Sequence, residues 1–273
     1  MPWLKPSTPT RSPDDIVGLE RSLDEAETAH LLGELQRSRR VTLEEVTVSA
    51  AMSALAEWSG EHSLLVDMLM SARQVDLKGV DLTRSLGWFS TIYPLHVDLK
   101  DTSTPMERLN STVEAMRTIR HREHEYGMLR YMSRNPALRS RLADMPQADI
   151  FFAYFGNIDA PEAGYARDIG DGLFRVDPAA TDMKRTMMGA FRYALEIAVY
   201  LRSGRLHMAW LANKTLLAGD AADQLAEACL RALRALAGAR VTTSVEEGCS
   251  TFSEPGLAAE QFDRILAELG QGL

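Results

Sequence analysis

The hydrophobic pattern changes its period along the chain, and this change limits the folds that the chain can adopt. Residues 22–36 and 43–59 carry apolar side chains at helical spacing, and Gly60 is expected to end the second of these helices. The continuous apolar runs 63–70 and 150–155 are too short for helices and are typical of buried strands. Strands mixed with helices predict an α/β (α+β) fold, in which a mixed β-sheet is flanked by helices.

The remaining segments extend this alternation. Pro105 follows Thr104 and is expected at the first position of a helix. Ser203-Gly204 is expected to form the turn of a hairpin, and Ser22 to Glu25 fit a capping box at the start of the first helix. Further strands are expected at 89–97, 191–201 and 205–212, further helices at 127–132, 220–236 and 258–269, and a loop at 160–185.

The composition is that of a soluble globular protein, and it excludes several classes of protein. With 30 Lys and Arg against 38 Asp and Glu, the net charge of −8 and the lack of a basic stripe argue against a nucleic-acid partner. The two cysteines, Cys229 and Cys249, are too few for a disulfide scaffold and are expected to be free thiols, with Cys229 in the core. No apolar run is long enough to span a membrane and no secretion signal is visible, so we expect a cytoplasmic protein without a membrane partner. Residues 1–15 are expected to form an extended lead-in, and residues 16–273 a single domain.

The residues alone do not define a reaction. The chain has no Gly-x-Ser-x-Gly motif, no phosphate-binding glycine loop and no zinc-ligand spacing. His121 and His124 could share a metal if both lie on one helix, but the sequence favours a solvated helix end, with cationic groups near the negative end of the helix dipole. His207 lies in a strand pattern, which favours a hydrogen-bonded sheet histidine over a catalytic base.

Four stretches, in order, resemble the C-terminal half of the condensation and epimerization domains of nonribosomal peptide synthetases. The first, GVDLTRSLGWFSTIYP at 79–94, is similar to the family segment GxDLSRTVGWFTxxYP, and it implies that Trp88 is buried. The second, YGMLRY at 126–131, is similar to GYGLLRYL, and the third, FAYFG at 152–156, is similar to FNYLG. The fourth, TFSEP at 251–255, is similar to the family ending FTPSDFPL.

This resemblance implies a fold and a set of partners. The fold is one lobe of the chloramphenicol acetyltransferase-like superfamily, a mixed sheet flanked by helices. The partners would be a peptidyl carrier protein or a synthetase subunit, in a homodimer or a hetero-complex. No cofactor or metal would be bound directly, and a phosphopantetheine arm would be brought in by the carrier protein.

The sequence departs from the family at the residues that carry its chemistry. The HHxxxDG motif of the N-terminal lobe does not occur, so that the lobe which supplies the acid–base histidine is missing from these residues. In the epimerase motif EGHGRE, Leu69 stands in the place of the glutamate and only Arg73 matches. Ala153 stands in the place of the FNYLG asparagine. Because epimerization needs a proton removed on one side and returned on the other, we expect no epimerase activity from this chain alone.

Three functional hypotheses follow from these departures. The first is an accessory or interaction module that completes, or docks onto, a synthetase or carrier protein. The second is an enzyme with altered chemistry that acts on a carrier-bound aminoacyl or peptidyl thioester at a cleft between subunits. The third is a fragment of a larger condensation or epimerization domain. For the second hypothesis, motif position alone nominates six cleft residues, each with an alternative structural role in ion pairs or packing: Arg73, His124, Glu125, Tyr126, Tyr154 and Asn157.

Overall fold

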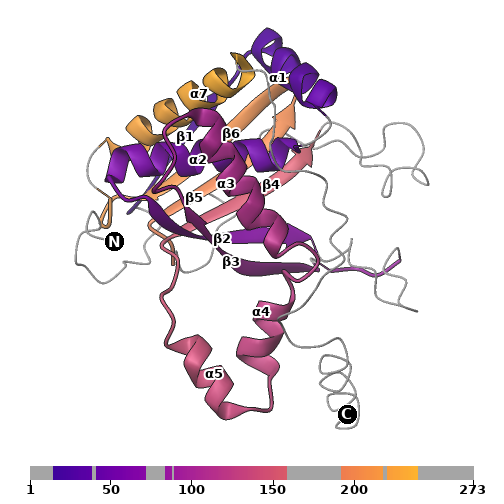
Figure 1. Cartoon of the computed structure of the whole chain (residues 1–273), viewed down its shortest axis with the longest axis vertical. Coiled ribbons are helices and arrows are strands. Elements are labelled where there is room, and N and C mark those ends of the chain that lie inside the picture. The colour runs from indigo at the N-terminus through magenta and orange to yellow at the C-terminus, as the bar shows by residue number, and fades with distance from the viewer. Residues whose placement is uncertain are drawn as a thin grey trace.

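A mixed six-stranded sheet forms the centre of the computed structural model, which describes residues 15–38, 41–71, 84–87, 89–158, 192–217 and 220–238 (Figure 1). Its strands are β1 (Ile16–Ser22), β2 (Ser63–Ser71), β3 (Ser90–Asp98), β4 (Ile150–Asn157), β5 (Leu195–Arg202) and β6 (Arg205–Asn213). The strand order is β1-β6-β5-β4-β2-β3. β4 runs parallel to β2 and to β5, and the other neighbouring pairs are antiparallel. The expected α/β class is confirmed.

Four helices cover one face of this sheet, which we call the helix face (Figure 1). They are α1 (Glu25–Ser38), α2 (Leu43–Ser59), α3 (Pro105–Thr118) and α7 (Ala221–Gly238). Three short helices project beyond β3 at the sheet edge, away from the other four (Figure 1). They are α4 (Glu125–Gly127), the π-helix η3 (Met128–Met132) and α5 (Pro136–Ala143).

The ends of α2 and α3 lie where the sequence predicts them. Thr42 and Glu45 form a capping box at the start of α2, and Gly60 ends that helix with a φ of 72°. Thr104 caps α3, and Pro105 occupies its first turn. The first helix begins later than expected, because Asp24 and Glu27, rather than Ser22 and Glu25, exchange the two capping hydrogen bonds.

The core lies between the helix face and the helices. α2 is buried from Glu45 to Ala56, because α3 and α7 flank it. Among the largest fully buried side chains are Trp210 of β6 and Phe152 of β4. Cys229 of α7 is a buried free thiol, as expected, and burial raises its pKa.

Some expectations need correction, and others lie outside the described residues. The sequence analysis missed β1 and α5. The metal hypothesis for His121 and His124 is wrong in its premise, because α3 ends at Thr118 and His121 lies in a turn with a φ of 71°. The expectations for residues 1–14, Trp88, the loop 160–185, Cys249 and the helix 258–269 lie outside the described residues.

Candidate functional site

The second face of the sheet, opposite the helix face, carries a row of apolar side chains across five strands. Leu69 of β2 lies opposite Ile92 of β3 and opposite Ala153 of β4. Ala153 in turn lies opposite Ala198 of β5, and Ala198 opposite Ala209 of β6. Since residues opposite one another in a sheet share a face, these five side chains form one line, which we call the apolar row.

Leu69 and Ala153 lie side by side at the centre of the apolar row. Ala153 is buried, and Leu69 is half-buried. They are the two positions at which the resemblance expects a glutamate and an asparagine. Neither side chain can hold a proton or donate a hydrogen bond, so the two strands that the structure describes there place no acid–base group at the centre of this face.

A buried carboxylate lies on the same face as the apolar row, two residues before Leu69 in β2. Asp67 of β2 is 6% exposed and accepts a hydrogen bond of 2.9 Å from the Tyr193 hydroxyl. The Arg192 guanidinium lies 3.5 Å from the same carboxylate oxygen. Burial raises the pKa of Asp67, and Tyr193 and Arg192 act in the opposite direction. The Tyr193 ring stacks on Phe151 at a centroid distance of 5.2 Å, which fixes its position.

Glu196 of β5 lies on the same face, in register with Phe151. Burial raises its pKa to about 7, so a large fraction of this carboxyl group is protonated at neutral pH. Sequence reasoning missed both Asp67 and Glu196. The signal was present, because each is a single acid inside an otherwise apolar strand.

His207 of β6 is hydrogen-bonded within the sheet, as the sequence favours. Its Nδ1 lies 2.6 Å from a carboxylate oxygen of Glu20 on β1. Glu20 also accepts hydrogen bonds from the Tyr200 hydroxyl at 3.0 Å and from Arg202 at 3.3 Å. The network joins the edge strand β1 to β5 and β6. The buried Nε2 of His207 has no hydrogen-bond partner among the described residues.

The structure places five of the six nominated residues, in two separate regions. His124, Glu125 and Tyr126 lie at α4, which contacts the edge strand β3. Tyr154 and Asn157 belong to β4, and β2 separates β4 from β3. The sixth, Arg73, lies outside the described residues.

For four of these residues the structure shows either a contact or the degree of exposure. Glu125 pairs with Arg122, with nitrogen–oxygen distances of 2.9 to 3.1 Å. Tyr126 and Tyr154 are partly buried against the hydrophobic core. Asn157 is exposed and lies at the end of β4, after a register shift. The described contacts do not bring these residues into one site.

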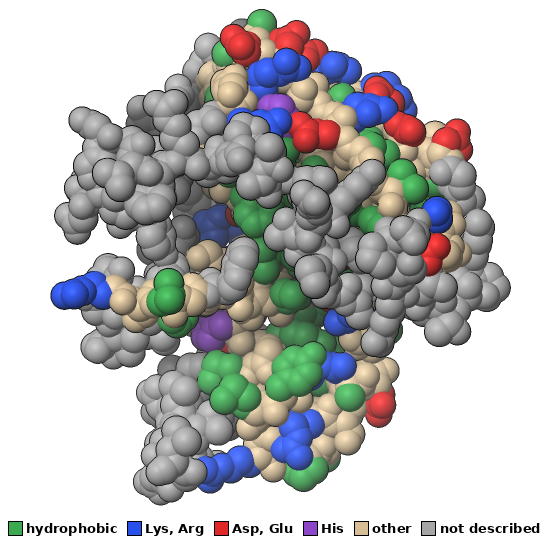
Figure 2. Space-filling model, turned by 180° about the vertical axis from the view of Figure 1, so that it is seen from behind, with side chains coloured by type: hydrophobic (Ala, Val, Ile, Leu, Met, Phe, Trp, Pro, Cys, Tyr) green, Lys and Arg blue, Asp and Glu red, His purple; other side chains and the backbone are tan. Residues whose placement is uncertain are grey.

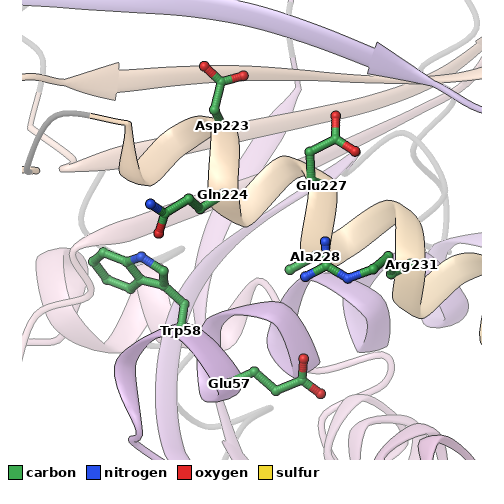
Figure 3. A pocket seen from close by; sticks show the side chains of 7 residues that line it. All are labelled: Glu57, Trp58, Asp223, Gln224, Glu227, Ala228 and Arg231. Atoms are coloured by element: carbon green, nitrogen blue, oxygen red, sulfur yellow. The ribbon is translucent and has the colours of Figure 1, made fainter.

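A cavity lies elsewhere, between α2 and α7 on the helix side of the molecule (Figure 3). Its volume is about 470 Å³, and Trp58 of α2 and Gln224 of α7 face each other across it (Figure 3). Its acids are already paired, Glu57 with Arg108, and Asp223 and Glu227 with Arg21. None of the five nominated residues that the structure describes lines this cavity.

No group of three or more His, Cys, Asp or Glu side chains in the described ranges could hold a metal ion. Within the same ranges, no helix has the length and apolar character needed to cross a membrane.

Comparison with known proteins agrees with this fold. A sequence profile of the condensation domain matches residues 5–247. The chain belongs to the condensation domain family. Among the relatives of this condensation-domain chain, one component of the linear gramicidin synthase of Brevibacillus parabrevis is 28% identical over 248 residues. Another component of the same synthase is 26% identical over 261 residues. These alignments cover 90% and 96% of this chain, but only 5% of each synthase component.

Solved structures with the same fold include two domains of peptide synthesis. The epimerization domain from the third module of tyrocidine synthetase B matches with a TM-score of 0.70 and 18% identity. The match covers 86% of this chain and 50% of that domain. The X-domain from teicoplanin biosynthesis matches with a TM-score of 0.59, again at 18% identity, over 85% of this chain and 49% of the X-domain. The chain therefore spans about half the length of these solved structures.

Proposed function

We propose that this condensation-family chain serves nonribosomal peptide synthesis as an accessory or interaction module that docks onto a carrier protein or synthetase subunit. The observation that carries the proposal is the pairing of Leu69 with Ala153 at the centre of the apolar row. These two positions are where the family resemblance expects the epimerase glutamate and an asparagine. With both polar groups replaced by hydrocarbon, neither Leu69 nor Ala153 offers a proton donor or acceptor at that point.

A binding role has a precedent on this fold. The X-domain from teicoplanin biosynthesis was solved in complex with OxyB, and it matches this chain with a TM-score of 0.58 over 85% of the chain. Condensation-type folds can therefore serve as docking platforms. In the proposed complex the phosphopantetheine arm arrives as part of the carrier protein, and a histidine of the HHxxxDG type would come from outside these residues.

The solution mass of the full chain tests the docking role. Light scattering would be measured on the chain alone and after mixing with carrier-bearing synthetase proteins from its own gene cluster. We expect a hetero-complex with at least one of them, with the mass of the two components together. A chain that remains uncomplexed with every one of these proteins would contradict the proposal.

A second candidate function is an enzyme acting on a carrier-bound aminoacyl or peptidyl thioester. The observation that favours it is the pair of carboxyl groups beside the apolar row, Asp67 and Glu196, whose pKa values are both raised by burial. Perturbed acids on one face are typical of active sites, although structural networks also produce them. If this function holds, Glu196→Gln abolishes turnover of such a thioester, whereas Glu61→Gln, a change at a partly exposed acid outside that face, leaves it unchanged.

A further inference from the structure

The hairpin formed by η3 and α5 is basic in an otherwise acidic chain. Residues 128–143, which we call the arginine hairpin, contain Arg130, Arg134, Arg139 and Arg141 and no Asp, Glu, Lys or His. The whole chain carries a net charge of −8. The hairpin therefore concentrates positive charge at one end of the molecule, where η3 and α5 project beyond β3 (Figure 1).

Two of the four arginines hold the hairpin together. Arg130 of η3 donates to the carbonyl oxygen of Leu142, and Arg139 of α5 donates to the carbonyl oxygen of Ser133. The Asn135 side chain caps α5 by accepting from the backbone N–H groups of Ala137 and Leu138, at 3.0 and 3.2 Å. These hydrogen bonds hold η3 and α5 together, so that the exposed side chains of the hairpin keep a fixed arrangement.

The other two arginines face solvent. Arg134 and Arg141 are exposed, and neither forms an ion pair with a described residue. Several other arginines of the described chain pair with acids, as Arg21 does with Asp223 and Glu227. Two exposed guanidinium groups without a carboxylate partner in the described ranges are therefore available to an acidic surface.

Apolar side chains are exposed next to these arginines. Tyr131 is 69% exposed and Met132 is 58% exposed, and Met145 beyond α5 is half-exposed. The Arg130 guanidinium lies 5.4 Å from the centre of the Tyr131 ring, which holds the ring outward. Hydrophobic and Lys or Arg side chains gather on the lower part of the molecule, where the hairpin lies (Figure 2). Arg, Tyr and Met are the residue types that protein interfaces favour.

We propose that the arginine hairpin is a docking surface for an acidic segment of a partner protein. Carboxylates of the partner would pair with Arg134 and Arg141, and its apolar side chains would cover Tyr131 and Met132. Exposed apolar groups beside the charges favour a protein over a nucleic acid, whose phosphates would meet a chain of net charge −8. This inference rests on the proposed function in one respect: it takes the natural partner to be a carrier protein or a synthetase subunit.

The test uses the full chain and a defined probe. The probe is an amphipathic helical peptide with glutamates on one face and leucines on the other, and its control has glutamine in place of each glutamate. Binding is measured by fluorescence anisotropy at low and at physiological salt. We expect the glutamate peptide to bind, to bind more weakly as salt rises, and to bind better than the glutamine peptide.

Variants of the hairpin locate the binding. The double variant Arg134→Glu/Arg141→Glu is expected to bind the glutamate peptide about tenfold more weakly or worse, because attraction becomes repulsion at two positions. Arg134→Lys/Arg141→Lys keeps the charge and is expected to retain most of the binding. Arg231→Glu reverses one charge at an exposed position of α7, outside the hairpin, and is expected to bind like the unchanged chain. Circular dichroism and thermal melting check that each variant is folded.

Three results would overturn the docking surface: no binding of the glutamate peptide, equal binding by the Arg134→Glu/Arg141→Glu variant, or equally tight hairpin-dependent binding of duplex DNA or of phosphatidylglycerol vesicles. A parallel measurement with the synthetase proteins separates the two proposals. If those proteins bind the unchanged chain and the double variant equally, the hairpin proposal fails and the proposed function stands. If the peptide binds through the hairpin but no synthetase protein binds, the proposed function fails and the surface stands.

Discussion

The side chains on the two faces of the sheet have different roles: those on the helix face form the core, and those on the second face line the candidate site. On the helix face, β2 contributes Leu64, Val66 and Met68, all at most 1% exposed, to a continuous core with α2, α3 and α7. On the second face, the alternate residues of the same strand include the buried acid Asp67 and the half-buried Leu69. The same nine-residue strand thus supports the fold on one side and lines the candidate site on the other.

This difference shows how a family fold can persist while its chemistry changes. Replacing a polar side chain by leucine or alanine on the second face leaves the packed core on the helix face intact, so the fold tolerates it. The reverse change on the helix face would bury a charge without a partner. The residues that identify the family are therefore not the residues that decide whether this member is an enzyme.

The largest expected effect comes from placing a charge on each face in turn. Met68 and Leu69 are neighbours in β2 that point to opposite faces. Met68→Glu buries an unpaired carboxylate in the core and is expected to cost about 4 kcal/mol or more of the free energy of unfolding. Leu69→Glu is expected to cost less than about 1.5 kcal/mol, because the side chain reaches partial solvent. Urea denaturation of both variants measures the difference, and equal costs would contradict the assignment of the two faces.

A cavity in the core should cost almost as much. Phe152 of β4 is fully buried, whereas Phe155 of the same strand is 47% exposed. Phe152→Ala is expected to destabilise the chain by about 3–5 kcal/mol, since it removes core contacts and leaves a cavity. Phe155→Ala is the matched control and is expected to cost less than about 1.5 kcal/mol. Chemical denaturation gives both values, and the account fails if the exposed phenylalanine matters more.

On the second face, the hydrogen bond to Asp67 should contribute a smaller amount. Tyr193→Phe removes the donor to a buried carboxylate and is expected to cost about 1–3 kcal/mol. The same substitution at the exposed Tyr131 is the control for loss of a hydroxyl group. A Tyr193→Phe variant as stable as the unchanged chain would show that Asp67 does not depend on this hydrogen bond.

The smallest effect concerns the pH dependence of stability. Because the folded-state pKa of Glu196 is raised to about 7, the folded chain holds a proton that the unfolded chain releases above its ordinary pKa of about 4.3. Stability is therefore expected to fall as pH rises from about 4.3 to 7 and to change no further above that, by about 1–2 kcal/mol in this partly solvated site. Denaturation midpoints of the unchanged chain and of Glu196→Gln test this, because the variant should lose this part of the slope. The same pH dependence of stability in both proteins would contradict the raised pKa of Glu196.

Local signals in the sequence predicted much of the fold. Gly60 and Pro105 marked a helix end and a helix start, and both elements lie where these residues place them. The Ser203-Gly204 turn was also predicted, and both residues have the positive φ that a two-residue hairpin needs. By contrast, β1 was missed because Ile16–Ser22 lacks a clear alternation and is held by its pairing with β6, a contact distant in the sequence.

The candidate site was less predictable, because its residues acquire their properties only through strand order. The family resemblance located Leu69 and Ala153, but only the parallel pairing of β2 with β4 makes them neighbours. Asp67 and Glu196 look like tolerated acids in apolar strands until the sheet buries them on one face. The arginines of residues 128–143 can be read from the sequence, but their arrangement on a hairpin could not be predicted, because α5 itself was not predicted.

Exchange of the α-hydrogen of a bound substrate shows directly whether the second face carries out acid–base chemistry. The chain would be incubated in D₂O with a carrier-bound aminoacyl thioester, and deuterium at the α-carbon would be measured by mass spectrometry after hydrolysis. Since Leu69 and Ala153 leave no acid–base group at the centre of the second face, we predict no more deuterium than in the sample without the chain. Deuterium incorporation that depends on the chain and disappears in Glu196→Gln would contradict the account and would make the second face an active site.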